Sequence, residues 1–222
     1  MLTTKSLAEE NSTQAAPAPE STKTAPPPPS NVSPTPKRIQ LFGTVEFKGN
    51  LKTLTQWLNV MKEHKKHPIF IHGSKLNATV LWDNWKVALE KMPPFERIKA
   101  VNSFWNKWPY RQDKDVYGKE DYWAAPYLFR KNSGDCEDYC IAKYFTLREV
   151  GFTSEQMRIV IVMEKIRNIP HAIVVVYINN DAYILDNLTN SVLSHTKSRN
   201  YAPQYSVNEQ FRWAHVRPKT PQ

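Results

Sequence analysis

The sequence predicts an α+β fold in which helices come first and an antiparallel sheet follows. Between residues 51 and 108, apolar side chains recur at three- and four-residue spacing, which is typical of amphipathic helices. From residue 158 onward, short β-branched and aromatic runs of strand length replace that pattern. With 222 residues, 41% of them hydrophobic, the chain can bury a sizeable core in one domain, with or without a small lobe.

The first 36 residues differ in composition from the rest of the chain. They hold eight of the 17 prolines and no aromatic residue, and they include the run "APPPPS". Such a segment cannot bury enough apolar surface to offset its chain entropy. We therefore expect residues 1–36 to form a disordered Pro-rich tether, followed by a helical lobe over residues 37–110 and a second part over residues 111–222.

Three amphipathic helices are expected in the helical lobe, where the pattern becomes helical from Leu41 onward. Their sequences are "LKTLTQWLNVMKEHKK", "LWDNWKVALEKM" and "FERIKAVNSFWNKW", and a Pro-Pro pair separates the last two. The tryptophans of this region could suggest a ligand cage, but aromatic residues at helical spacing are typical of a core. We assign to the core Trp82, Trp85, Trp105 and Trp108.

A polar, turn-rich stretch over residues 109–134 leads into the next helix. A loop of this length is unusual in a compact domain unless it is functional. The helix is predicted over residues 136–149, with Ser133 or Asp135 as its cap and Gly151 as its C-terminal stop. Cys136 then occupies the first helical position.

Three strands are predicted over residues 158–163, 171–178 and 182–187, and "QFRWAHV" near the C-terminus can add another. Asn179 and Asn180 separate the second strand from the third, and this pair favours a two-residue type I′ turn. The strands therefore form an antiparallel hairpin whose register follows from the length of the turn.

The two cysteines, Cys136 and Cys140, lie four residues apart on the predicted helix. That spacing makes a disulfide hard to close, and no further Cys or His pair completes a zinc site. A helix N-terminus favours a thiolate through its unpaired amides and its dipole. Cys136 is therefore the candidate nucleophile, and Cys140 is assigned to the core.

A thiol nucleophile needs a histidine base and a third group that orients the imidazole. His171 opens the central predicted strand. If Asn179 and Asn180 form the whole turn, the residue opposite Asp186 is Ile173, and His171 lies two residues further on the same face, about 7 Å away on the diagonal. A three-residue loop would place His171 and Asp186 on opposite faces. The predicted catalytic set is Cys136, His171 and Asp186. Whether His171 and Asp186 lie on the same face depends on the length of the turn at Asn179 and Asn180.

Charge and hydropathy exclude other classes of function. The net charge is +9, but the basic residues form no stripe with interleaved aromatic residues, so we expect no nucleic-acid partner. The longest apolar run, "AIVVVYI", is far shorter than the roughly 18 residues of a membrane span, so we expect no direct membrane insertion. The N-terminus shows no apolar stretch of a secretory signal.

Several motifs together resemble the bacterial transglutaminase-like cysteine proteinases of the LapG type. They are "GDCEDYCIAKYFTLREVGF", the upstream "DYWAAPYLF", the histidine at the head of an apolar strand, "ILDN" and the early "LFGTVEFKG". The resemblance covers about residues 41–216. It implies a papain/transglutaminase-like catalytic core over residues 111–222, with Cys136 as nucleophile, His171 as base and Asp186 as orienting acid. Cys140 departs from the pattern, where a small residue such as alanine is expected.

The resemblance also implies a calcium ion held beside the nucleophile. Asp135 and Glu137 supply hard oxygen ligands, and Asp138 is a possible third carboxylate. Because calcium takes six to eight oxygens, the preceding loop would have to contribute the rest. From the residues alone, the favoured role of these acids is only to cap the helix, and it is the resemblance that favours calcium.

The chemistry that the residues themselves support is acyl transfer, with the Cys136 amide as an oxyanion donor and Trp123 near a substrate subsite. The resemblance implies more: a periplasmic endopeptidase that cuts a large surface adhesin near its N-terminus, at an Ala-Ala type of site, and so disperses a biofilm. It also implies control by an inner-membrane receptor for cyclic di-GMP. Two alternatives remain open at this point, a transglutaminase-like amide transferase or amidase with the same triad, and an inactive calcium-dependent binding module.

Overall fold

The structure is a computed structural model, and it describes residues 39–218. The predicted tether, residues 1–36, lies outside the described residues. In chain order the elements are η1 (Leu41–Gly43), β1 (Val45–Gly49), α1 (Thr55–Lys66), α2 (Trp82–Glu90), α3 (Pro94–Trp105), α4 (Asp113–Tyr117), α5 (Pro126–Asn132), α6 (Cys136–Glu149), η2 (Ser154–Gln156), β2 (Met157–Glu164), β3 (Ile169–Ile178), β4 (Asp181–Asp186), β5 (Thr189–Ser194), β6 (Tyr201–Val207) and β7 (Arg212–Val216).

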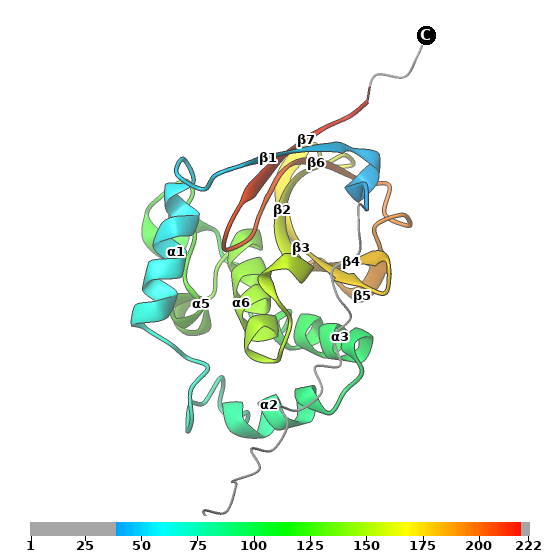
Figure 1. The fold of residues 1–222 in the computed structure, drawn as a ribbon. Coiled ribbons are helices and arrows are strands. Elements are labelled where there is room, and N and C mark those ends of the chain that lie inside the picture. The colour runs from blue at the N-terminus through cyan, green and yellow to red at the C-terminus, as the bar shows by residue number, and fades with distance from the viewer. Residues whose placement is uncertain (1–38, 219–222) are drawn as a thin grey trace, which may run out of the picture.

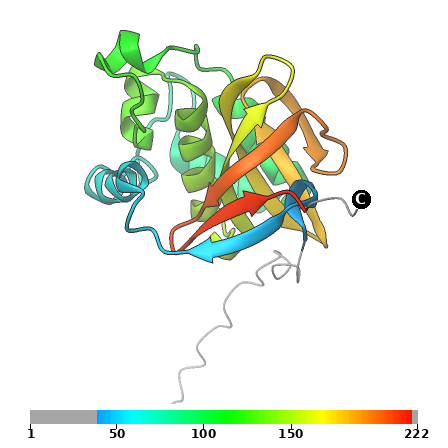
Figure 2. The ribbon, with the colours of Figure 1, turned by 90° about the horizontal axis from the view of Figure 1, so that it is seen from above.

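The seven strands form a single antiparallel sheet in the order β1-β7-β6-β2-β3-β4-β5. The sheet is strongly curved, and the α-helices gather on its outer face, as Figures 1 and 2 show. Helix α6 lies at the centre of this layer and packs against β3 and β2. The predicted α+β class is confirmed.

Alternate side chains of the central strands β2, β3 and β4 enter two different hydrophobic clusters. On the helix side, Val174 and Val176 of β3 join a large cluster that also holds core residues of α1, α3 and α6. On the other side, Ile173 and Val175 join a smaller cluster inside the curve of the sheet. Leu41 of η1 is fully buried in that smaller cluster. One large core therefore unites residues on both sides of position 110.

Helix α6 is buried on almost all sides, because other helices flank it and the sheet lies behind it. Eleven of its 14 residues are buried, including the charged residues Glu137, Asp138 and Lys143. A helix enclosed in this way does not need a single apolar stripe. The start and end of α6 agree with the predicted helix over residues 136–149.

The hairpin of β3 and β4 has the predicted register. Ile178 pairs with Asp181, and Val174 pairs with Leu185 four positions further along. Asn179 and Asn180 have φ angles of 49° and 61°, as both central residues of a type I′ turn require. His171 and Asp186 therefore lie on the same face of the sheet.

Three strands and two helices were not predicted. The segment after Leu41 was expected to be helical, yet β1 runs along the sheet edge and pairs only with β7. Val45 and Phe47 of β1 are 40% and 60% exposed, so the strand carries little of the burial pattern that identifies strands. Likewise β5 and β6 escaped prediction, and the stretch predicted as loop contains α4 and α5.

The tryptophans assigned to the core do pack there, with Trp82 and Trp105 at most 2% exposed and Trp85 and Trp108 partly buried against them. Within residues 39–218, no helix combines the length and the apolar character that a bilayer crossing requires.

Candidate active site

Cys136 is the first residue of α6. Asp135 occupies the N-cap position, but its side chain makes no capping hydrogen bond. Ser133, the other predicted cap, instead ends α5 with a φ of 64°. Capping alone therefore does not explain why an acid stands at position 135.

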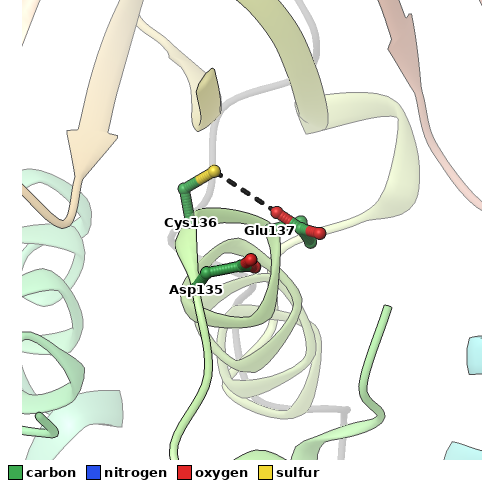
Figure 3. A group of neighbouring side chains, drawn as sticks. All are labelled: Asp135, Cys136 and Glu137. Atoms are coloured by element: carbon green, nitrogen blue, oxygen red, sulfur yellow. Dashed lines mark hydrogen bonds between the residues drawn. The ribbon is translucent and has the colours of Figure 1, made fainter. Parts of the chain in front are cut away.

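The Cys136 thiol lies close to two carboxylates, those of Asp135 and Glu137, as Figure 3 shows. Its Sγ donates a hydrogen bond to Oε2 of Glu137 at 3.3 Å. Burial, followed by the negative charges of Glu137 and Asp135, raises the pKa of the Cys136 thiol well above its ordinary value. The helix dipole was expected to favour the thiolate, but in this setting burial and the neighbouring acids outweigh it.

His171 and Asp186 meet at the open end of the β3–β4 hairpin. His171 Nε2 lies 2.9 Å from Oδ1 of Asp186, and both side chains are almost fully buried. Burial alone would raise the pKa of Asp186. The hydrogen bonds from His171, from the amide of Leu188 and from the hydroxyl of Tyr201 together hold that pKa below its ordinary value. Asp186 is therefore a stable anion beside the imidazole.

The position of Asp186 is fixed by its backbone as well. Asn106, which directly follows α3, donates from Nδ2 to the carbonyl of Asp186 at 2.9 Å and to the carbonyl of Thr189 at 3.0 Å. Asn102 of α3 donates to the same Thr189 carbonyl. A helix of the N-terminal half thus holds the strand end that carries the acid.

Two cavities flank the thiol. One has a volume of about 390 Å³ and includes Trp123 in its lining, and the other has a volume of about 330 Å³ and includes Arg167. Both cavities are lined by Cys136 and His171. An extended chain that runs through both would pass directly over the sulfur and the imidazole. Trp123, at 7% exposure, forms part of one wall, and its role in a substrate subsite stays a prediction.

Carboxylates from two further segments join the acids of α6. Ligand atoms of Asp113, Asp135 and Asp138 lie within 4.8 Å of one another, and so do those of Asp113, Asp121 and Glu137. Sequence reasoning named Asp135, Glu137 and Asp138 but not Asp113 or Asp121. Asp113 lies on the five-residue helix α4 and Asp121 in the loop after it, where no periodic pattern connects them with α6.

The cluster fits a hard cation. Three of its buried oxygens have no hydrogen-bond partner among the described residues: Asp113 Oδ1, Asp135 Oδ1 and Asp138 Oδ2. Buried carboxylates without partners are rare unless a metal ion or a proton compensates them. Burial and mutual repulsion raise the pKa of Asp113 to about 6 and that of Glu137 to about 10. Carboxylate oxygens in this number suit calcium better than a soft metal.

Hydrogen bonds from backbone amides fix the orientation of two carboxylates of the cluster, those of Asp113 and Asp138. The amide of Ala124 donates to Oδ1 of Asp138 at 2.6 Å, and the amide of Tyr122 donates to Oδ2 of Asp113. These bonds use one oxygen of each carboxylate and leave the other oxygen for a ligand. The loop before α5 is therefore hydrogen-bonded to the acid cluster.

The absence of a side chain at Gly134 leaves space for the Asp138 carboxylate. A Cβ added at Gly134 would lie 1.9 Å from Oδ2 of Asp138. The Asp138 carboxylate is fully buried and cannot move away. We expect Gly134→Ala to cost about 1–3 kcal/mol of stability and to weaken calcium binding at least tenfold, measured by thermal unfolding with and without calcium. Repeating the substitution in an Asp138→Ala background is the control, and an equal cost in both backgrounds would disprove the clash.

Comparison with known proteins identifies one matching family and several similar solved structures. The family model of the bacterial transglutaminase-like cysteine proteinases (BTLCP) matches residues 83–220, more than half of the chain. The calcium-bound structure of Legionella pneumophila LapG is 31% identical with a TM-score of 0.57, over 71% of this chain and 86% of that one. A second Legionella pneumophila LapG structure is 34% identical with a TM-score of 0.55, over 60% and 75%. A search of curated protein sequences gave no match.

Proposed function

Because the chain belongs to the bacterial transglutaminase-like cysteine proteinase family, we propose that it is an endopeptidase with Cys136 as nucleophile, His171 as base and Asp186 as orienting acid. One observation carries the assignment of roles. His171 lines both of the cavities that contain the Cys136 thiol, and its Nε2 is committed to Asp186. A histidine held in this way can act as the base for a nucleophile that an extended peptide can reach.

The tautomer of His171 follows from its hydrogen bond. With the proton of the neutral ring on Nε2 and donated to Asp186, Nδ1 is left as the basic nitrogen. Nδ1 accepts the thiol proton of Cys136, and the sulfur attacks the scissile carbonyl. The backbone amide of Cys136 stabilises the oxyanion, and His171 then returns the proton to the leaving amine. Water hydrolyses the resulting thioester by the same route and releases the acid.

We propose that the acid cluster holds a calcium ion, since its donors are hard oxygens that the fold leaves without partners. The residues that would hold it are Asp113, Asp135, Glu137 and Asp138, with Asp121 at the rim. The bound ion would supply positive charge beside the thiol. The relative with a calcium-bound structure supports the choice of this ion.

For the substrate, we propose a large surface adhesin that is cut near its N-terminus at an Ala-Ala type of site, in the periplasm, with release from a biofilm as the outcome. We further propose control by the periplasmic domain of an inner-membrane receptor for cyclic di-GMP. The similarity to Legionella pneumophila LapG supports these proposals, together with cavities on both sides of the thiol that accept an extended chain.

The experiment that tests this function is a cleavage assay on the N-terminal segment of such an adhesin from the same genome. We expect one calcium-dependent cut, located by mass spectrometry of the fragments. A parallel reaction contains a primary amine such as cadaverine. Incorporation of the amine without fragmentation would replace the endopeptidase by an amide transferase, and no reaction of either kind would favour a binding module.

Removal of the orienting acid gives a second prediction. Asp186→Asn keeps the size of the side chain but loses the charge that selects the tautomer of His171. We expect kcat to fall by about 10³- to 10⁴-fold with little change in KM. The matched control is Asp181→Asn at the other end of β4, where the carboxylate accepts hydrogen bonds from the amide of Ala182 and the hydroxyl of Ser194. A decrease in kcat of equal size in both variants would show that Asp186 has no special role in catalysis.

A further inference from the structure

A third cavity lies away from the thiol and has a different chemical character. Its volume is about 370 Å³, and its walls come from η1, the end of β2, the turn after β5, the start of β6 and the residue after β7. Cys136, His171 and Asp186 do not line it. The described side chains around it include three basic ones, Lys165, Arg199 and Arg217, and not one carboxylate.

These three cations have no ion-pair partner within residues 39–218. The nearest acid along the chain, Glu164, pairs with Arg167 instead. Like charges around one cavity repel one another, and an anion between them would convert that repulsion into attraction. Lys165, Arg199 and Arg217 come from three separate segments of the chain and line the same cavity.

His195 adds a neutral donor whose direction is fixed. Its Nδ1 accepts a hydrogen bond from the backbone amide of Phe42 at 3.1 Å. Nδ1 is therefore unprotonated, and the neutral ring carries its proton on Nε2. Burial lowers the pKa of His195, which keeps the ring in this form at neutral pH. The ring can therefore donate from Nε2 without a change of protonation.

The loop that carries these donors is ordered by its own hydrogen bonds. The backbone amide of Lys165 donates to the carbonyl of Asn200 at 2.8 Å, and Lys165 Nζ donates to the carbonyl of Arg199. The amide of Ser198 donates to the carbonyl of His195. Thr196 and Ser198, which also line the cavity, belong to this hydrogen-bonded loop. The backbone of this wall is therefore preorganised.

We propose that this cavity binds a phosphate group. Three cations and several neutral donors from different directions match an ion with multiple oxygens and about two negative charges, and arginine is well suited to such oxygens. The volume exceeds that of one phosphate, so a phosphate monoester also fits. The site is separate from the acid cluster, whose negative charge would repel the same ligand.

The test measures binding of inorganic phosphate by isothermal titration at constant ionic strength, with chloride in place of phosphate as the blank and EGTA present to prevent calcium phosphate. We expect saturable binding, weakened at least tenfold by Arg199→Gln and by Lys165→Gln. The matched control is Lys197→Gln in the same turn, since Lys197 does not line the cavity; its affinity should stay within twofold. Circular dichroism verifies that each variant is folded.

Two outcomes would overturn the proposal: no saturable binding, or equal weakening in Arg199→Gln and Lys197→Gln, which would indicate general attraction to a basic surface. A second titration with glycerol 3-phosphate identifies the source of the group. Tighter binding than inorganic phosphate supports an esterified phosphate, and weaker binding supports the free ion. Because the measurement is of binding, its result does not depend on the proposed protease activity.

Discussion

Cys136→Ala is expected to abolish peptide cleavage, with a loss of at least about 1,000-fold in kcat. Without the sulfur no thioester can form, and His171 and Asp186 are left with no group to activate. The thiol makes only one hydrogen bond in the described structure, to Glu137, so its removal should leave the fold intact. Thermal unfolding of the variant should confirm this, and fragment formation on a gel or by mass spectrometry measures the activity.

The chain contains a matched control for this substitution. Cys140 lies one turn further along α6, is 1% exposed and packs in the core. Cys140→Ala should keep its activity within about threefold and lose about 1 kcal/mol of stability through a small cavity. Cleavage that survives in Cys136→Ala, or that is lost only in Cys140→Ala, would reject Cys136 as the nucleophile.

Removal of calcium is expected to reduce cleavage by at least about 100-fold. With no cation present, burial above all raises the pKa of the Cys136 thiol, and the neighbouring acids add to the effect, so almost no thiolate exists at neutral pH. A cation within the acid cluster would reverse the sign of the local potential. Alkylation of Cys136 by iodoacetamide measures thiolate directly, and its rate should fall on addition of EGTA and recover with calcium.

Variants of the cluster sharpen this test. Glu137→Gln should weaken calcium binding at least tenfold and slow alkylation at any subsaturating calcium concentration. Asp115→Asn is the control, because this exposed acid lies on α4 beside Asp113 but belongs to none of the clusters. Alkylation and cleavage that do not respond to EGTA would mean that the acids do not serve the thiol through a bound cation.

Local patterns in the sequence were sufficient for the part of the site that lies on regular elements. The bounds of α6 followed from a cap, an apolar period and a glycine, and the alignment of His171 with Asp186 followed from a two-residue turn. In each case the information is carried by neighbours in the chain. Secondary structure of this kind is governed by short-range rules, so it can be derived without a tertiary structure.

The rest of the site depends on tertiary contacts that no local pattern contains. Asp113 and Asp121 approach α6 only because the segment between α3 and α5 folds back onto it. The edge strand β1 exists because β7, more than 160 residues later, offers it hydrogen bonds. The protonation state of Cys136 likewise depends on burial and on acids whose positions the helix dipole does not reveal.

The pairing of β1 with β7 also determines how the folded part is connected to the remainder of the chain. Val45 faces Val216, so the first and last strands begin and end at the same corner of the sheet, and Phe42 and Arg217 line one cavity beside it. The two ends of the described part of the chain therefore lie side by side at one place in the fold. That place is on an edge strand, with β7, β6 and β2 between it and the strand that bears His171. Both ends are thereby kept apart from the strand whose histidine lines the cleft, although they are distant from each other in the sequence.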